Sequence, residues 1–485
     1  MTNPSDSFYH LHNVDLTSGA CRGLACYVAR GDDPARWTRA CESSSRVYCL
    51  GKCYRAPAAG DDSERPAISV SAGEAVILGN VATGGARTLE AYRSRGGYQA
   101  LDRALKLSPE EIVAAVEASG LRGRGGAGFP TGRKWRAVFA SKGRTRYVVA
   151  NADEGDPGAY IDRCILEDDP HRVLEAMAVA GYAVGAQKGY IYVRAEYPDA
   201  RFRLETAIEE ARGSGLLGKS ILGSPFSFDL QLEIGRGSYL CGEETALLNA
   251  IEGLRPEVRA RPPYPADCGL FGCPTLVNNV ETLAAVPWII EHGPARFRAL
   301  GLPASYGTKV VSLNSLFNRP GLYEVEFGVS VRHIIEHLGG GLRAGTLKGV
   351  IIGGPLAGVI PPSLVDTVFG FDELHAIGAS VGHGGIVAFD ERTSIPDLVH
   401  HVFDFGAYES CGKCTPCRLG ARRVEAIFGG IVTAGRATLA DRSEWLDLIH
   451  ALSLTSLCGH GSGLAEFASS IVQHYAHELQ ACFVS

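Results

Sequence analysis

The chain has 485 residues, of which 46% are hydrophobic and 21% are charged, and its formal net charge at pH 7 is −6. This length exceeds what one hydrophobic core supports, so we expect three or four domains. A mildly acidic chain gives no electrostatic reason to expect binding to nucleic acid or to an anionic membrane. The first residues lack a secretory signal, and Gly and Pro interrupt the longest apolar stretches. We therefore expect a cytoplasmic protein without direct membrane insertion.

The predicted elements begin with a small cysteine-containing unit at residues 1–64, followed by a helix at 108–119. Ser108 caps this helix, Glu111 completes a capping box and Gly120 ends it. Strands then alternate with helices up to about residue 290. The predicted strands are 147–150, 190–193 and 230–234, and the predicted helices are 171–184, 199–212 and 241–252. This alternation predicts an α/β fold with a mainly parallel sheet.

The pattern changes after residue 300. Short β-rich segments at 309–313, 321–327 and 350–352, with a helix at 330–338, predict a small mixed β domain. From about residue 394 the chain is predicted to be helical. We therefore divide the chain into four domains, at 1–64, 65–300, 301–393 and 394–485.

Fourteen cysteines in a chain expected to be cytoplasmic indicate metal binding rather than disulfides. Cys411-Gly-Lys-Cys414-Thr-Pro-Cys417 has the C-x₂-C-x₂-C spacing that brings three thiolates to one face of a [4Fe–4S] cluster. Cys458, in a second glycine-rich loop, is the best candidate for the fourth ligand. A zinc site fits less well because zinc more often uses paired C-x₂-C knuckles.

Three polar, glycine-rich loops fall within the predicted α/β domain. Gly123-Arg-Gly-Gly-Ala-Gly128 follows a helix instead of a strand, so it fails the context test for a dinucleotide fingerprint. Its backbone can still approach a phosphate or a ring closely, and Arg124 and Lys134 could neutralise phosphate charge. The loops at 151–158 and 235–244 each follow a strand, at the ligand-binding edge of such sheets. Each loop alone could be a plain flexible loop, or a helix start with acidic residues in its first turn. The three loops together favour a shared cofactor site.

These motifs occur in a familiar order. LRGRGGAGFPTG at 121–132, the loop at 151–158, the segments 235–245, 261–265 and 276–282, and the cysteine triplet follow one another. Together they closely resemble the FMN-binding, NADH-oxidising flavoprotein family over about residues 85–480. That family contains the 51-kDa-type subunit of respiratory complex I and the diaphorase subunits of NAD-linked formate dehydrogenases and hydrogenases.

The resemblance implies a Rossmann-like FMN domain, a ubiquitin-like β-grasp domain of the SLBB type and a helical bundle that holds the [4Fe–4S] cluster. It also implies that NADH passes a hydride to FMN and that FMN passes single electrons to the cluster, with no catalytic acid or base. The implied FMN contacts are Gly123, Arg124, Gly125, Lys134, Asn151, Asp153, Glu154, Tyr239, Gly242, Glu243, Val277, Asn278, Asn279 and Thr282. The implied NAD(H) contacts are Phe129, Asp156, Glu244, Arg261 and Tyr264.

The N-terminal pairs Cys21/Cys26 and Cys49/Cys53 resemble part of a thioredoxin-like [2Fe–2S] ferredoxin, over about residues 10–60. Four thiolates suit a [2Fe–2S] cluster. The alternative is a relic with free or zinc-bound thiols. We expect the remaining cysteines to be structural, the five at 164, 241, 268, 273 and 482 as small buried residues.

The leading hypothesis is a diaphorase subunit of a molybdenum- or tungsten-dependent formate dehydrogenase. Asp156, Arg261 and Tyr264 stand where complex I subunits usually carry Glu, Lys and Phe, which weakens the complex I interpretation. A hydrogenase diaphorase or a complex I subunit are the alternatives of the same class, and a flavin-free electron-transfer scaffold is the alternative of another class. The expected partners are a large molybdenum, tungsten or nickel catalytic subunit and a small ferredoxin-like subunit.

Overall fold

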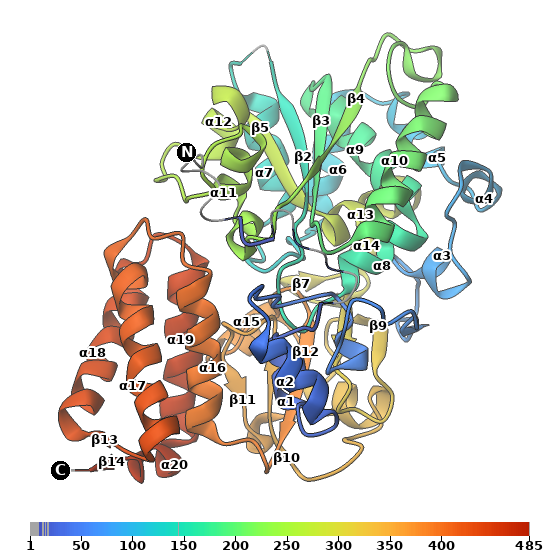
Figure 1. Cartoon of the computed structure of the whole chain (residues 1–485). Helices are drawn as coiled ribbons and strands as arrows, with labels where there is room; N and C mark the ends of the chain where they lie inside the picture. The colour runs from blue at the N-terminus through green and yellow to red at the C-terminus, as the bar shows by residue number, and fades with distance from the viewer. Residues whose placement is uncertain (1–8, 12–13, 15, 17–18, 144, 485) are drawn as a thin grey trace.

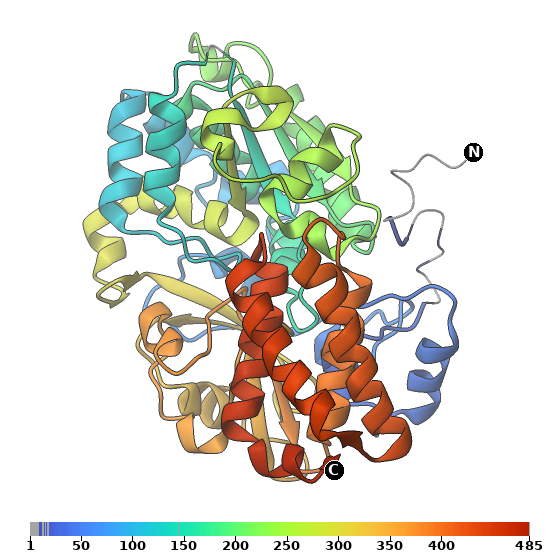
Figure 2. The same cartoon turned by 90° about the vertical axis from the view of Figure 1, so that its left-hand side faces the viewer.

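The computed structural model describes residues 9–11, 14, 16, 19–143 and 145–484. A parallel-sheet unit lies above a second, mixed sheet in Figure 1, and a helical bundle stands beside the second sheet. The quarter-turn in Figure 2 shows the bundle in front and the N-terminal cysteine unit to one side of it. Within the described residues, no helix is both long and apolar enough to cross a membrane.

The first sheet has four strands, in the order β4-β3-β2-β5, and every neighbouring pair is parallel. This confirms the predicted parallel sheet. Its strands are β2 (Tyr147–Ala152), β3 (Lys188–Val193), β4 (Asp229–Ile234) and β5 (Thr275–Asn279). Strand β5 was not predicted, because its last two residues are both Asn and interrupt the apolar pattern.

Helices cover this sheet and join its strands. The predicted helix at 108–119 is α6 (Pro109–Ser119), with both hydrogen bonds of its capping box present and Gly120 at its end. Helix α9 (Pro170–Val184) is buried along almost its whole length between other helices and the sheet. The other main helices are α7 (Thr131–Ala140), α8 (Ile161–Asp168), α10 (Pro198–Gly213), α11 (Glu244–Ile251) and α13 (Val280–His292).

The second sheet has six strands, in the order β1-β9-β8-β12-β10-β11, with mixed directions. They are β1 (Ala67–Val70), β8 (Thr308–Leu313), β9 (Gly321–Glu326), β10 (Leu347–Ile352), β11 (Val359–Ile360) and β12 (Gly385–Asp390). Strand β1 falls in the domain predicted at 65–300, yet it pairs with β9 of the second sheet. Gly321 permits this pairing, because a Cβ there would meet the Ala67 carbonyl oxygen at 2.4 Å. The helix expected at 330–338 is a short π-helix (His333–Leu338).

The C-terminal region is helical, as predicted, and consists of α16 (Ile395–Tyr408), α17 (Ala421–Ala434), α18 (Leu439–Thr455), α19 (Gly459–His474) and α20 (Ala476–Gln480). Its core contains Phe428 edge-on to Trp445, with ring centroids 4.9 Å apart. The N-terminal unit contains α1 (Leu24–Val28) and α2 (Pro34–Glu42). This unit packs on α16, where Tyr27 stacks on His401 at 4.2 Å and the Tyr48 hydroxyl donates to Asp404 over 2.9 Å.

Candidate functional site

The glycine loop between α6 and α7 is closed on itself and joined to the start of α13. The Gly123 amide donates to the Phe129 carbonyl over 2.8 Å, and the Thr131 amide donates to the Leu121 carbonyl over 2.8 Å. The Arg124 amide donates to the Thr282 hydroxyl over 2.8 Å. A tight loop of this kind presents backbone, not bulky side chains, to whatever lies above it.

The Arg124 side chain leaves this loop and reaches Tyr306 and Phe327, which lie next to the ends of β8 and β9. Its guanidinium donates to the carbonyl oxygens of Tyr306 at 2.8 Å and Arg122 at 3.1 Å, and it lies 4.8 Å from the Phe327 ring. Burial lowers the pKa of Arg124 to about 10. The guanidinium is thus buried among protein carbonyls and is not placed to neutralise a phosphate.

The loop after β2 contributes a buried carboxyl group. Asn151 donates from its side chain to the Gly242 carbonyl over 2.8 Å and accepts from the Asp153 amide over 3.1 Å. One Asp153 carboxyl oxygen has no hydrogen-bond partner among the described residues, and burial raises the pKa of this group well above its usual range. A buried carboxyl oxygen without a protein partner points to a ligand that donates to it. Tyr239 donates to Asp156 over 2.7 Å in the same region.

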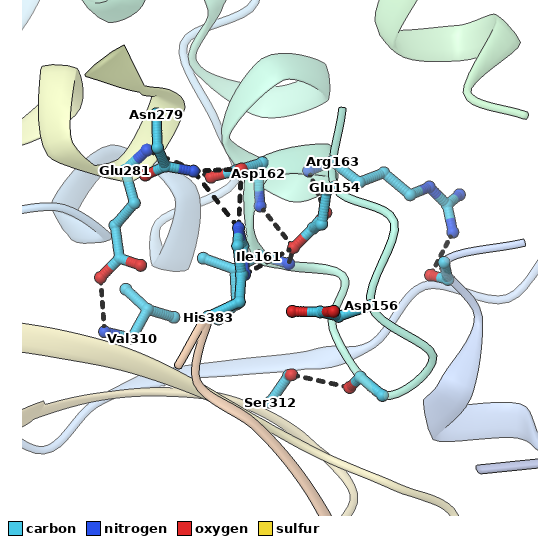
Figure 3. A network of polar contacts seen from close by, with 12 residues as sticks. Glu154, Asp156, Ile161, Asp162, Arg163, Asn279, Glu281, Val310, Ser312 and His383 are labelled. Atoms are coloured by element: carbon cyan, nitrogen blue, oxygen red, sulfur yellow. Dashed lines mark hydrogen bonds and ion pairs between the residues drawn. The ribbon is translucent and has the colours of Figure 1, made fainter. Parts of the chain in front are cut away.

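Glu154 is used differently from the other predicted contacts. Its carboxylate accepts from the amides of Ile161, Asp162 and Arg163 at 2.6, 3.1 and 3.0 Å, at the start of α8 (Figure 3). Burial raises the pKa of Glu154 to about 7. Its side chain therefore organises the loop instead of pointing toward open space.

A charged cluster forms where α7 and α11 begin. Lys134 donates to Glu244 over 2.9 Å and to the Val277 carbonyl over 3.1 Å, while Arg261 lies 3.2 Å from the other Glu244 oxygen. Burial alone would raise the pKa of Glu244, but these two cations lower it. Glu243 caps α11 by accepting from the amides of Thr245 and Ala246, and its other oxygen has no hydrogen-bond partner in the described chain.

The segment at the end of β5 completes this edge of the sheet. Asn278 accepts from the Trp135 indole N–H over 2.9 Å, and Asn279 caps α13 by accepting from the Thr282 amide over 3.1 Å. Two aromatic residues predicted to contact NAD(H), Phe129 and Tyr264, are 47% and 55% exposed. Exposed aromatic rings beside a polar cluster suit stacking on a planar ligand. Glycine backbone, buried acceptors and exposed rings together fit a flavin and a nicotinamide nucleotide.

The four C-terminal cysteines predicted as ligands meet around one pocket. Its lining includes Cys411, Cys414, Cys417 and Cys458 with the apolar residues Leu240, Val258 and Leu457. Cys458 precedes α19, and the amides of His460 and Gly461 point at its sulfur. The Ser410 hydroxyl lies 3.2 Å from the Cys417 sulfur. Four converging thiols with N–H and O–H groups directed at sulfur fit an iron–sulfur cluster.

A single turn joins the two sites. In the 3₁₀ turn Tyr239–Gly242, Tyr239 contacts Asp156 of the loop after β2, while the next residue, Leu240, lines the cysteine pocket. The Tyr239 amide donates to Glu409, two residues before Cys411, over 3.0 Å. This short covalent and hydrogen-bonded connection suits electron transfer between the sites.

The four N-terminal cysteines are also brought together, and all are buried. The sulfurs of Cys49 and Cys53 are 3.9 Å apart, and the thiols of Cys26 and Cys21 form a hydrogen bond. Bonding to Cys49, burial and the charges of the other three thiols raise the pKa of Cys53. The amides of Gly23, Gly51 and Ala58 donate to the sulfurs of Cys21, Cys49 and Cys26 over 3.4, 3.3 and 3.3 Å.

The isolated cysteines differ in burial. Cys164 and Cys241 are buried, as predicted, and burial raises the pKa of both thiols. The prediction of burial is wrong for Cys268, which is exposed because it ends the short surface helix Pro265–Cys268. Cys273 and Cys482 are half-buried, and Cys41 is exposed.

Sequence patterns missed several buried polar residues around the site. His383 contacts Asp162 although 221 positions separate them, and Arg194 donates to the Cys49 carbonyl over 3.0 Å. Neither residue belongs to a motif, and only the folded chain brings them to their partners. An isolated polar residue inside an apolar stretch, such as Arg194 directly after β3, was the one available indication.

Two family models match the chain. The Nuo51 FMN-binding domain matches residues 116–288, and the NADH-ubiquinone oxidoreductase-F iron–sulfur binding region matches residues 397–482. The F 2 subunit of NADH-quinone oxidoreductase from Rhizobium meliloti (strain 1021) is 43% identical over 410 residues, which cover 84% of this chain and 97% of that protein. The HndC subunit of the NADP-reducing hydrogenase from Solidesulfovibrio fructosivorans is 44% identical over 395 residues, which cover 81% of this chain and 80% of that protein.

A solved structure extends the similarity to the N-terminal unit. The crystal structure of an NAD⁺-reducing [NiFe]-hydrogenase in the H₂-reduced state matches with a TM-score of 0.83 at 29% identity. The match covers 99% of this chain and 87% of that chain. The chain therefore belongs to the flavoprotein family of the complex I 51-kDa-type subunit, and it is an NAD(H) oxidoreductase module that binds FMN and a [4Fe–4S] cluster.

Proposed function

We propose that this chain is the diaphorase subunit of a larger complex, in which it exchanges electrons between NAD(H) and iron–sulfur clusters through FMN. The observation that carries this proposal is the single turn at residues 239–242, which contacts the flavin loop on one side and lines the four-cysteine pocket on the other. When bound, FMN exchanges a hydride with the nicotinamide ring and single electrons with iron–sulfur clusters.

The chain's own residues bind and orient the cofactors in this proposal. The glycine loop at 123–128 approaches the flavin through its backbone, and Asp153 offers its unpaired carboxyl oxygen to a ring N–H. Lys134 holds Glu244 and the end of β5 in place. Phe129 and Tyr264 stack on NAD(H), and Arg261 lies beside its polar groups. The remaining contacts follow the residue set predicted from the resemblance.

We also assign the metal ligands by proposal. Cys411, Cys414, Cys417 and Cys458 hold the [4Fe–4S] cluster, and Cys21, Cys26, Cys49 and Cys53 hold a [2Fe–2S] cluster. The second assignment is supported by three backbone amides that donate to sulfur and by the burial of all four thiols. The Cys49 sulfur lies 3.8 Å from the carbonyl oxygen of Asp156, so this centre contacts the flavin loop directly.

The domain names remain part of the proposal. We assign a partial thioredoxin-like unit to residues 1–64, a Rossmann-like domain to 65–300, a ubiquitin-like SLBB-type domain to 301–393 and a cluster-binding helical bundle to 394–485. Strand β1 modifies this division, because residues 67–70 complete the second sheet. The four parallel strands support the second name, and the helices α16 to α20 support the last.

The first candidate for the complex is a molybdenum- or tungsten-dependent formate dehydrogenase. Asp156, Arg261 and Tyr264 weaken the complex I alternative, because complex I subunits usually carry Glu, Lys and Phe there. The second candidate is an NAD⁺-reducing hydrogenase, favoured because the hydrogenase structure matches 99% of this chain, N-terminal unit included. By sequence alone, the hydrogenase relative and the NADH-quinone oxidoreductase relatives match similar shares of the chain, 81% to 84%.

Native mass spectrometry of the purified complex, with metal analysis and substrate assays, tests these candidates. Molybdenum or tungsten with formate-dependent reduction of NAD⁺ supports the first candidate, and nickel with H₂-dependent reduction supports the second. Membrane subunits with quinone reductase activity would contradict both. A purified chain without a flavin absorbance band would contradict the diaphorase function itself.

A further inference from the structure

We propose that His383, in the turn that leads into β12, is a positioning residue for the flavin site: as an imidazolium it lies between Asp162 and Glu154 and so fixes the loops that line the site. The proposal rests on the flavin site assigned above. Figure 3 shows His383 reaching from the second sheet toward α8, with Asp162 and Glu154 facing its ring.

The contacts of the imidazole ring carry the proposal. Its Nε2 lies 2.9 Å from an Asp162 oxygen, and its Nδ1 lies 3.4 Å from a Glu154 oxygen. His383 and both carboxyl groups are buried. The Asn279 amide nitrogen also lies 3.2 Å from Nε2, and Nδ1 makes no hydrogen bond in the described residues, so Glu154 acts on the ring through its charge. A carboxylate on each side of the ring favours the imidazolium over the neutral ring. The buried carboxylates also need a positive partner.

Asp162 connects His383 to Asn279, one of the proposed flavin contacts. The same Asp162 oxygen accepts from the Asn279 side chain over 2.6 Å, and its other oxygen accepts from the Glu281 amide over 3.1 Å. Asn279 packs against the glycine loop so closely that a Cβ on Gly125 would meet the Asn279 Cβ at 2.7 Å. His383 therefore reaches the glycine loop through two side chains.

The backbone around His383 reinforces this arrangement. Gly382 forms a β-bridge with Gly126 of the glycine loop. A Cβ on Gly385 would meet the Gly158 backbone at 2.8 Å, and the Gly158 carbonyl accepts from the Ser312 hydroxyl over 2.9 Å. The turn at 382–385 thus touches both loops that border the site, and His383 is its charged member.

A metal ion fits this cluster less well than a proton. One donor atom from each of Glu154, Asp162 and His383 lies within 4.8 Å of the others, which is short enough to hold a cation. However, the Glu154 oxygens already accept from three amides at the positive end of α8 and from the Tyr197 hydroxyl at 3.1 Å. These donors occupy the Glu154 lone pairs that a metal ion would need for coordination.

Electrostatics supports the charged state. Burial alone would lower the pKa of His383, but Asp162 and Glu154 outweigh it and raise this pKa to about 9. Asp156 also faces the ring, and Lys309 of β8 opposes the charge while it is itself paired with Glu281 of α13. Because the folded pKa lies above the usual value, the contribution of the imidazolium is complete below about pH 6.5 and is lost as pH rises through 9.

The test is the release of FMN from the purified complex on dilution, followed by flavin fluorescence between pH 7.5 and 10. We expect His383→Gln to raise the FMN dissociation constant roughly tenfold at pH 7.5, since a charged hydrogen bond is lost. The FMN dissociation constant of the variant, divided by that of the wild type, should fall toward one above pH 9, because the wild-type imidazolium then also loses its charge. Because FMN titrates in the same way with both proteins, its own titration cancels in this ratio of dissociation constants.

Two further variants separate this role from a general effect on folding. Asp162→Asn should move the wild-type pH transition to lower pH, since it removes the charge that holds the proton. His171→Gln is the matched control: His171 is buried and bonds to Glu210 over 2.9 Å, away from the flavin loops, so its pH profile should equal the wild type.

Three outcomes would overturn the proposal. The first is a dissociation constant for His383→Gln that is raised by the same factor at every pH, and the second is an unchanged transition in Asp162→Asn. The third is the loss of one equivalent of divalent metal in His383→Gln, which would make the cluster a metal site. If the wild-type chain itself binds no FMN, the proposed flavin site fails, and that result is distinct from these three.

Discussion

The two four-cysteine centres differ in how they meet solvent and the flavin site. At the C-terminal centre three of the four cysteines are half-buried, and apolar residues form the walls. At the N-terminal centre Cys21, Cys26, Cys49 and Cys53 are only 3, 0, 1 and 2% exposed. The C-terminal centre reaches the flavin loop through Tyr239, and the N-terminal centre touches it at Asp156. Only the C-terminal centre approaches the surface, so we expect electrons to leave for a partner there.

The largest effect should follow from Cys414→Ser. This change removes one thiolate from the C-terminal centre, so the electron paramagnetic resonance signal of the reduced [4Fe–4S] cluster should disappear while FMN stays bound. Electron transfer to partner subunits should stop, and NADH oxidation with an artificial acceptor that reacts at the flavin should continue. A complete cluster signal in this variant would remove Cys414 from the ligand set.

Cys49→Ser should break the other centre alone. We expect iron to fall from about six to about four atoms per chain, with the [4Fe–4S] signal retained. Cys41→Ser is the matched control, because Cys41 lies in the same unit but is exposed. If Cys49→Ser leaves the iron content unchanged, the N-terminal thiols hold no [2Fe–2S] cluster and the comparison between two redox centres fails.

A smaller effect concerns the choice between NAD(H) and NADP(H), the nucleotides that could exchange electrons with both centres. We expect the wild type to prefer NAD(H), because the Glu244 carboxylate would oppose a 2′-phosphate. Glu244→Gln leaves Lys134 and Arg261 without their shared anion, so the preference for NAD(H) over NADP(H) should fall roughly five- to tenfold. The measurement is kcat/KM for both cofactors with an artificial acceptor. An unchanged ratio would show that Glu244 lies away from the ribose.

The smallest expected effect is on the contact between the N-terminal cysteine unit and helix α16 of the C-terminal bundle. Tyr48→Phe removes the hydrogen bond to Asp404 of α16 and should weaken the docking of the N-terminal unit by about 1 kcal/mol. Faster hydrogen exchange at residues 20–60, with unchanged exchange in α17 and α18, is the expected result. Equal acceleration in both regions would show that they unfold together.

Local patterns in the sequence predicted one cysteine centre and most strands of the first sheet. The C-x₂-C-x₂-C triplet is a local pattern. Sequence patterns also predicted β2 and β3, which are largely apolar, and β4, in which apolar and polar residues alternate. Strand β5 was missed, since Asn278 and Asn279 interrupt such a pattern although burial and neighbouring strands make it a strand. The glycine loop was predicted as a cofactor loop from its small residues, which is a property of the backbone.

Long-range polar contacts were beyond prediction. Nothing in the sequence around Arg124 indicates that its guanidinium bonds to Tyr306, because the carbonyl of Tyr306 that accepts from it is 182 positions away. The same holds for His383 and Asp162. Such contacts depend on how two sheets pack, and hydrophobic periodicity carries no information about side-chain partners between domains.

The most direct measurement is anaerobic titration of the purified protein with NADH, followed at once by flavin absorbance and by electron paramagnetic resonance. Addition of NADH should bleach the flavin band and produce the [4Fe–4S] signal in the wild type, and should bleach the flavin without that signal in Cys414→Ser. A wild-type protein whose flavin band does not respond to NADH, or whose cluster is reduced while the flavin is absent, would contradict electron flow from NAD(H) through FMN to the C-terminal cysteines.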